Sequence, residues 1–395
     1  MSDNLSLSGD TINIEPHGSE DKFRAALFYF VKTSKKGVQV SIIRIGKTRV
    51  SLDLIVAFVA TASLVTLSLV YGGSPHARSS NDKRPALRLA YFPNLTHAPA
   101  LVGIARGDFQ RELPGYFIEP KVVNAGPDAM EALLAGEVDV AYVGPSPAVN
   151  TYLKSGGKAL KILAGCCSGG ASLIARNDEE IHTVADLDHK RVAVPQLGGT
   201  QDVSLRHFLD LNHLAPEEKG GTVQIIPVKN PDILALFLQR QIDAAWVPEP
   251  WASRLKKDAH AKTVADERDL WPGNAFTTTV IVARSAFVKQ HPDAIQGILR
   301  AHLADIAWLN THEAEGQKIV NSELKRLTGK GLTAGVLTEA WNHLSFTDDP
   351  NRENITALAE AAEKAGYLKG NLNLDGAFDT IALASAKQQR RLEAR

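Results

Sequence analysis

Cysteine is nearly absent from this chain, which has only the adjacent pair Cys166 and Cys167 among 395 residues. Neighbouring cysteines can pair only in a small strained ring, so we do not expect an ordinary structural disulfide. Two thiols are also too few for a structural zinc site. We therefore expect two small, buried residues at a strand end, with a vicinal redox disulfide as the alternative.

The chain also lacks an excess of charge of either sign, because 44 basic residues balance 44 acidic ones. A nucleic-acid-binding surface requires a basic excess, so no nucleic-acid partner is expected. The length of 395 residues and the hydrophobic content of 44% are sufficient for one or two ordinary cores. Length alone predicts roughly two to three domains.

Long apolar runs are rare, and the one at residues 54–74 follows a segment, residues 22–49, that is basic and contains no acidic residue. This order is typical of an export signal or a membrane anchor. We assign residues 1–50 to a leader, 51–74 to a signal peptide or anchor, and 75–86 to a linker. A cleaved signal is favoured because small residues end the run. The predicted localisation is periplasmic, with membrane contact only through the N-terminal segment.

Residues 122–147 and 226–251 resemble each other without a gap, 104 positions apart. Each copy predicts a helix that starts at Pro-Asp, a short turn, and a buried strand that ends at a loop rich in glycine or proline. Ligands of open α/β sheets bind at the carboxyl ends of strands, so two such units predict two lobes that face one cleft. The recurring residues include Pro127 and Pro231, Asp128 and Asp232, Asp139 and Asp243, and Tyr142 and Trp246.

The remaining pattern alternates strands and helices, which predicts an α/β protein with mostly parallel sheets and flanking helices. We assign residues 87–178 to lobe 1, 179–272 to lobe 2, and 273–395 to a return to lobe 1 with C-terminal helices. Residues 171–176 and 279–284 also resemble each other. If these two strands lie side by side, they form a double hinge between the lobes.

Five motifs in order then resemble a known family: YFPNLTHAPALVGIARGDF, GPDAMEALLAGEVDVAYVGPSPA, SGGASLIAR, VAVPQLGGTQD and IDAAWVPEPWAS. They resemble the substrate-binding proteins of ABC importers for nitrate, bicarbonate, taurine and aliphatic sulfonates, which have the type II periplasmic-binding fold. The resemblance covers residues 87–309. It implies a monomeric protein that captures a ligand between two lobes and delivers it to a permease and its ATPase, without catalysis.

The loops at the strand ends supply the candidate ligand contacts. Gly198, Gly199 and Thr200 lie between a strand and a helix, where backbone amides and the positive helix end bind an oxyanion. A simple helix cap is the structural alternative for Thr200. The complete candidate set is Tyr91, Asn94, Thr96, His97, Gly144, Ser146, Gly169, Gly170, Gly198, Gly199, Thr200, Trp246 and Glu249. We expect no catalytic residue, no metal and no cofactor.

Glu249 and the aromatic residues distinguish between ligands. A carboxylate at a cleft edge could pair with a ligand ammonium, although it could equally bond local backbone amides. Tyr91, Tyr142 and Trp246 could line an apolar wall, or belong to the core. We therefore expect a small organic oxyanion, an alkanesulfonate or taurine-like compound, with nitrate or bicarbonate second.

Two further functions stay open at this point. The fold that the resemblance implies is similar to that of thiamine-pyrimidine synthases, but this chain lacks the cysteine cluster of those enzymes. A ligand sensor held at the membrane by a retained anchor is the other alternative, and cleavage of the signal would distinguish it from an importer component.

Overall fold

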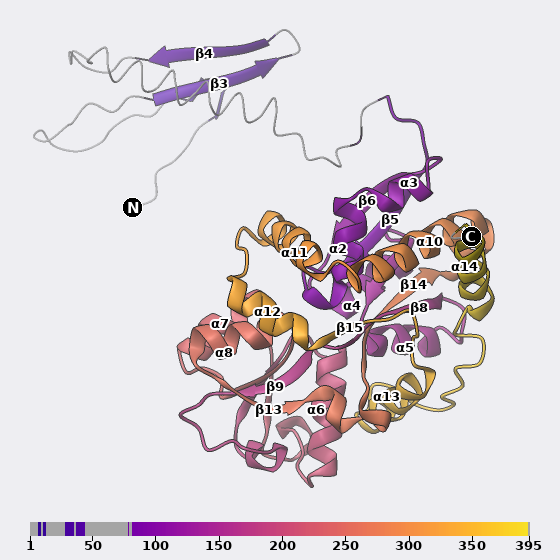
Figure 1. Ribbon diagram of the computed structural model, residues 1–395. Coiled ribbons are helices and arrows are strands. Elements are labelled where there is room, and N and C mark those ends of the chain that lie inside the picture. The colour runs from indigo at the N-terminus through magenta and orange to yellow at the C-terminus, as the bar shows by residue number, and fades with distance from the viewer. Residues whose placement is uncertain are drawn as a thin grey trace, which may run out of the picture. The chain divides into compact units, whose positions relative to one another are not determined.

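The computed structural model describes residues 7–8, 11–12, 28–34, 37–43, 78 and 81–393. The chain divides into two compact units, Met1–Pro75 and His76–Arg395 (Figure 1). In the first unit, β1 (Leu7–Ser8) pairs antiparallel with β2 (Thr11–Ile12), and β3 (Phe28–Ser34) pairs antiparallel with β4 (Gly37–Ile43). The apolar run at 54–74 lies outside the described residues. Within the described part, no helix combines the length and the apolar character needed to cross a membrane.

The second unit contains two mixed sheets. The six-stranded sheet has the order β15 (Leu344–Phe346), β8 (Leu160–Gly169), β14 (Thr277–Arg284), β7 (Val140–Val143), β5 (Ala86–Tyr91), β6 (Phe117–Val122). The five-stranded sheet has the order β11 (Gln224–Pro227), β10 (Arg191–Val194), β12 (Ala244–Pro248), β9 (Ala171–Ala175), β13 (Lys262–Asp266). Parallel pairing joins β6, β5 and β7 in one sheet and β11, β10 and β12 in the other. The other half of each sheet is antiparallel, so the pairing is more mixed than the alternation of elements predicts.

Helices cover these sheets, as the α/β pattern predicts (Figure 1). The long helix α10 packs against α2, α3 and α14, whereas α7 packs against α8, and α13 contacts both α5 and α6. The α-helices are α2 (Ala98–Ala105), α3 (Asp108–Glu112), α4 (Gly126–Leu134), α5 (Pro145–Lys154), α6 (Thr200–Leu211), α7 (Asn230–Leu238), α8 (Trp251–Ala259), α9 (Ser285–Gln290), α10 (Pro292–Leu309), α11 (Glu313–Thr328), α12 (Ala334–Asn342), α13 (Arg352–Lys364) and α14 (Thr380–Glu393). The short 3-10 helices are η1 (Leu95–His97), η2 (Val184–Leu187), η3 (Glu217–Lys219), η4 (Glu267–Leu270) and η5 (Pro272–Asn274).

The chain passes between the two sheets twice. It leaves β8 for β9 at Gly169 and Gly170, whose φ angles of 75° and 74° lie in the left-handed region that glycine adopts without strain. It returns from β13 to β14 through η4 and η5. The expected side-by-side pairing of residues 171–176 with 279–284 is wrong, because β9 pairs with β12 and β13 while β14 pairs with β7 and β8.

The two copies of the sequence repeat fold alike, as predicted. Helices α4 and α7 begin and end at positions 104 residues apart, and each leads into a buried strand, β7 or β12. Strand β14 runs antiparallel beside β7, and β9 runs antiparallel beside β12. The similar segments 171–176 and 279–284 therefore occupy equivalent places in the two sheets, which explains their resemblance.

A buried aspartate stands at the start of the central strand in each copy. In the first sheet, Asp139 Oδ2 accepts hydrogen bonds from Arg88 N at 3.0 Å and from Arg88 Nε at 2.8 Å. Its Oδ1 accepts from Arg88 Nη2 at 2.7 Å and from Arg284 Nη2 at 3.0 Å. Burial raises the pKa of Asp139, but these hydrogen bonds outweigh burial and leave the pKa below its ordinary value. One carboxylate thus joins three neighbouring strands.

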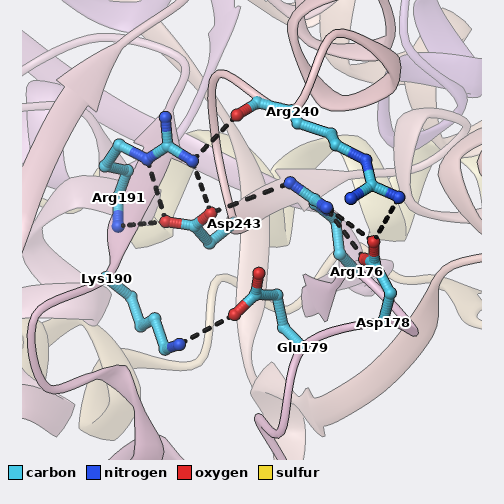
Figure 2. A network of polar contacts seen from close by, with 7 residues as sticks. All are labelled: Arg176, Asp178, Glu179, Lys190, Arg191, Arg240 and Asp243. Atoms are coloured by element: carbon cyan, nitrogen blue, oxygen red, sulfur yellow. Dashed lines mark hydrogen bonds and ion pairs between the residues drawn. The ribbon is translucent and has the colours of Figure 1, made fainter.

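Asp243 does the same in the second sheet (Figure 2). Its Oδ2 accepts from Arg191 N at 2.9 Å and from Arg191 Nε at 3.0 Å, and its Oδ1 accepts from Arg191 Nη2 at 2.7 Å. Arg176 Nη1 lies 3.9 Å from Asp243 Oδ1. Arg176 also donates two hydrogen bonds to Asp178, which forms an ion pair with Arg240. We refer to each aspartate with its two arginines as a clamp.

Glu267, the first residue of η4, is a fully buried carboxyl on the return path between the sheets. Ser204 of α6 donates its hydroxyl hydrogen bond to Glu267 Oε1. Burial raises the pKa of Glu267 to about 8, with a smaller contribution from the charge on Asp266. The side chain is therefore protonated at neutral pH.

We predict that Asp139→Ala lowers the free energy of unfolding by roughly 3 kcal/mol, because it leaves two partly buried arginines without their shared partner. Chemical denaturation measures this difference. Asp375→Ala is the control, since Asp375 and Arg352 form a pair whose side chains are 79% and 58% exposed. The control should cost less than about 1 kcal/mol. Equal losses in both variants would contradict the role of the clamp.

We also predict that Glu267→Gln changes how the melting temperature depends on pH. A carboxyl whose folded pKa is raised from 4.5 to about 8 stabilises the fold fully below its unfolded pKa, and this stability is lost as pH rises through the folded value. The neutral amide cannot ionise. The melting temperature of the variant should therefore rise relative to that of the parent as the pH increases from roughly 5 to 9. Parallel melting curves for the two proteins across this range would contradict the assignment.

Candidate functional site

The candidate site is a cleft to which both sheets contribute, with an empty volume of about 440 Å³ including its mouth. Its walls come from the loops after β5, β6, β7 and β10, from the end of β12, from the starts of α4, α5, α6 and α7, and from the start of β14. It is lined by Phe92, Asn94, Thr96, His97, Asn124, Ala125, Gly126, Gly144, Pro147, Pro195, Gln196, Gly199, Thr200, Gln201, Asn230, Pro248, Thr278 and Thr279. None of these residues carries an ionised side chain.

Three helices have their first residue in the lining of this cleft. These residues are Gly126 of α4, Thr200 of α6 and Asn230 of α7. None of the three helices has a side-chain hydrogen bond capping its N-terminus. The first turn of a helix has backbone N–H groups without intrahelical partners and carries partial positive charge. The cleft is therefore suited to an oxyanion held by backbone dipoles.

Asn94 has a fixed orientation. Its Oδ1 accepts a hydrogen bond from Trp251 Nε1 at 2.9 Å, and an indole nitrogen can only donate. The amide nitrogen of Asn94 is therefore the group that it presents as a donor. The bond also joins the loop after β5 to α8, that is, the two sides of the cleft.

His97 is a neutral donor. Burial lowers the pKa of this residue to about 3. Its Nδ1 accepts from the backbone N of Phe92 at 3.4 Å, and the two rings stack with centroids 4.4 Å apart. In a neutral imidazole whose Nδ1 is an acceptor, Nε2 carries the proton. His97 can thus donate to an anion without bringing a charge.

Thr200 and Gly144 meet across the cleft. Thr200 Oγ1 accepts from Ser146 N at 3.4 Å, so the hydroxyl proton is left to donate. A Cβ added at Gly144 would lie 2.3 Å from Thr200 Oγ1 and 3.2 Å from Thr200 Cβ. Only glycine at position 144 therefore allows the two sides to approach this closely.

The cleft lining includes six of the thirteen candidates from the sequence, and the other seven lie elsewhere. Asn94, Thr96, His97, Gly144, Gly199 and Thr200 line the cleft. Gly169 and Gly170 form the crossing between sheets, and Ser146 touches Thr200 only through its backbone. Gly198 donates its N–H to Asp202 Oδ2 at 2.7 Å, and Tyr91 belongs to the apolar core of the first sheet.

Trp246 and Glu249 do not line the cleft as the sequence analysis expected. Trp246 is fully buried and stacks on Phe208 at 5.3 Å, so it is a core residue. Glu249 is 1% exposed, its Oε2 accepts from Ser253 N at 3.0 Å, and its Oε1 accepts from Ser253 Oγ at 2.9 Å. Burial raises the pKa of this carboxyl. The expected pairing with a ligand amine is replaced by the local alternative, in which Glu249 caps the first turn of α8.

Several lining residues escaped the sequence analysis. Asn230 and Pro248 could have been found, because each stands in the second repeat copy at the position of a lining residue of the first copy, Gly126 or Gly144. Gln196 lies in the same loop as the predicted residue Gly199 but was not selected. Thr278 and Thr279 had no such signal, since only tertiary contacts bring β14 to the cleft. Among the described residues, no cluster of histidine, cysteine or acidic side chains could hold a metal ion.

Comparison with known proteins identifies the family. Residues 80–322 match the model of the NMT1-like family, and the chain belongs to that family. A Brucella abortus protein named as a binding protein is 27% identical over 275 residues, which cover 68% of this chain and 79% of that protein. The taurine-binding periplasmic protein of Escherichia coli is 26% identical over 206 residues, 51% of this chain and 60% of that protein.

Solved structures establish the fold. The alkanesulfonate-binding protein of Xanthomonas axonopodis pv. citri, bound to MOPS, superposes with a TM-score of 0.61 at 20% identity, over 73% of this chain and 96% of that chain. A Candida albicans protein described as having the generic periplasmic binding protein fold gives a TM-score of 0.58 at 16% identity. The periplasmic-binding fold predicted from the sequence is thereby confirmed.

We predict that Gly144→Ala weakens ligand binding at least about tenfold, because the new methyl group would collide with Thr200 and hold the two sides apart. Calorimetric titration measures the affinity, and small-angle scattering measures the separation of the two sides. Gly335→Ala is the matched control, since a Cβ there meets no atom within 4 Å. Unchanged affinity in Gly144→Ala would show that this close approach does not matter for binding.

Proposed function

We propose that this chain is an extracytoplasmic solute-binding protein of an ABC importer. It captures a small organic oxyanion, an alkanesulfonate or taurine-like compound, between its two sides and delivers it to a permease and its ATPase. The observation that carries this proposal is a cleft in which three uncapped helix N-termini meet and no ionised side chain lines the wall. The names of the relatives, which include taurine and alkanesulfonate binders, support it.

The neutral lining suits transport. Backbone dipoles and neutral donors such as Asn94, His97 and Thr200 stabilise an anion without a permanent counter-charge. An anion held in this way can be released when the two sides separate and water returns to the helix ends. The role is binding and delivery, with no catalytic step.

Nitrate or bicarbonate is the second candidate ligand. A nitrate/nitrite binding protein of Synechococcus elongatus is 30% identical over 114 residues, 28% of this chain and 24% of that protein. Thiamine-pyrimidine synthesis and membrane-anchored sensing are the remaining alternatives. The fate of residues 51–74 decides between a released periplasmic protein and an anchored one.

The proposal is tested by a thermal-shift screen of the full chain in mild detergent against taurine, alkanesulfonates, nitrate, bicarbonate and pyrimidine precursors. A ligand at a hundred times its dissociation constant stabilises the fold by about 2.7 kcal/mol, which gives a visible rise in melting temperature. We expect shifts with sulfonates. A shift with nitrate or bicarbonate alone would select the second candidate, and no shift with any anion would overturn the proposal.

Thr200→Val locates the ligand in the cleft. The substitution removes the hydroxyl donor with little change of volume, so it should weaken the binding of a sulfonate by about 1 to 2 kcal/mol, the size of one hydrogen bond to a charged acceptor. Isothermal calorimetry measures the loss. Full affinity in this variant would remove Thr200 from the ligand contacts.

A further inference from the structure

Three side-chain oxygens at the cleft have no hydrogen-bond partner among the described residues: Gln196 Oε1, Asn230 Oδ1 and Thr279 Oγ1. Asn230 is 4% exposed and Thr279 is 1% exposed. Buried polar atoms in native proteins are nearly always hydrogen-bonded, because an unpaired one loses its hydration without compensation. Three such atoms around one cleft point to a partner supplied by the ligand.

The chemistry of Gln196 is fixed by its neighbour. Its Nε2 donates to Asp128 Oδ1 at 2.8 Å, and a carboxylate oxygen can only accept. The remaining amide atom, Oε1, is therefore an acceptor that needs a donor. Asn230 is the first residue of α7, at the position where the first repeat copy has Gly126. Its side chain is thus a polar group that only the second copy brings to the cleft.

The lining consequently contains two kinds of group. Asn94, His97 and the helix starts are donors, which suit the oxyanion. Gln196 presents an acceptor, the side-chain oxygens of Asn230 and Thr279 also lack a donor, and a simple oxyanion has no proton to give them. A ligand that satisfies both kinds of group carries a hydrogen-bond donor in addition to its anionic group.

The residues that line the cleft also indicate whether the hydrogen-bond donor of the ligand is charged or neutral. An ammonium group enclosed in the cleft would face no carboxylate there, because the cleft is lined by neutral residues. Asp128 already accepts from Gln196, and both oxygens of Glu249 are bonded to Ser253. Burial of an unpaired charge is far more costly than burial of a neutral hydroxyl or amide that finds an acceptor.

We propose that Gln196, Asn230 and Thr279 form a second subsite that accepts a hydrogen bond from a neutral hydroxyl or amide group of the ligand. The cargo is then a small oxyanion that carries such a group, in preference to a plain alkanesulfonate or an aminosulfonate. This inference rests on the proposed function and makes its ligand class more specific.

Calorimetric titration of the full chain with three sulfonates that share the ethanesulfonate skeleton tests the inference. We expect hydroxyethanesulfonate to bind about five- to tenfold more tightly than ethanesulfonate, the ratio that one neutral hydrogen bond produces. It should also bind more tightly than aminoethanesulfonate. Equal affinity for ethanesulfonate, or tightest binding of aminoethanesulfonate, would overturn the subsite. If none of the three binds, the sulfonate ligand of the proposed function fails, and this outcome is distinct from equal binding of all three.

Two variants test which residues produce the preference for the hydroxyl compound. Asn230→Asp keeps the size and the acceptor but adds a negative charge, which the start of α7 tolerates. It should reverse the order, so that aminoethanesulfonate binds more tightly than hydroxyethanesulfonate. Thr279→Val should reduce the preference for the hydroxyl compound about twofold or more while ethanesulfonate still binds. An unchanged order of affinities in Asn230→Asp would overturn the assignment.

Thr277→Val is the matched control on the same strand. Thr277 is also buried, but its hydroxyl donates to the carbonyl oxygen of Pro350 at 2.9 Å, and it does not line the cleft. The control should lose stability without any change in the ratio of the three affinities. A changed ratio in this variant as well would show that the preference reports general loosening of β14, and the subsite would be rejected.

Discussion

A carboxylate shared between strands is the interaction on which the two sheets depend. Asp139 and Asp243 each stand at the beginning of a central strand, and each holds the backbone and the guanidinium of an arginine on the parallel neighbour. A second arginine reaches each aspartate from the antiparallel side. These bonds fix the register of three strands at one end of each sheet. They also satisfy a buried charge that would otherwise be strongly destabilising.

The consequence appears at the opposite ends of the same strands. Residues at the carboxyl ends of β7, β10 and β12 line the cleft, together with the first residues of α4, α6 and α7. The ends of a repeated strand and helix unit thereby become a binding cleft. The clamps are remote from the cleft, so structural stability and ligand chemistry are carried by different residues of the same repeat.

The two copies are equal in backbone and unequal in side chains. Gly126 and Asn230 begin equivalent helices. Gly126 has no side chain, whereas Asn230 adds an amide side chain. A repeat can keep its backbone geometry while the side chain at one position changes, since many residue types can occupy the first position of a helix. Under the proposed function, such differences adapt a symmetric frame to an asymmetric ligand. Of the two alternatives that the sequence left open for Glu249, the structure shows the local one, since its carboxyl is bonded to Ser253 one helical turn away.

The sequence by itself determined the α/β class, the repeated unit, the strand-end loops and part of the donor set, because periodicity and turn residues act over short distances along the chain. It also restricted Cys166 and Cys167 to a buried role, and both are buried thiols. Tertiary structure alone decided which residues of these loops line the cleft, and that β14 contributes to it. The stacking of Trp246 on Phe208, the place of β9 in the second sheet, and the presence of both Thr279 and Asn230 in the cleft lining all depend on contacts between distant segments. Local patterns contain no information on such contacts, since their energy comes from packing in three dimensions.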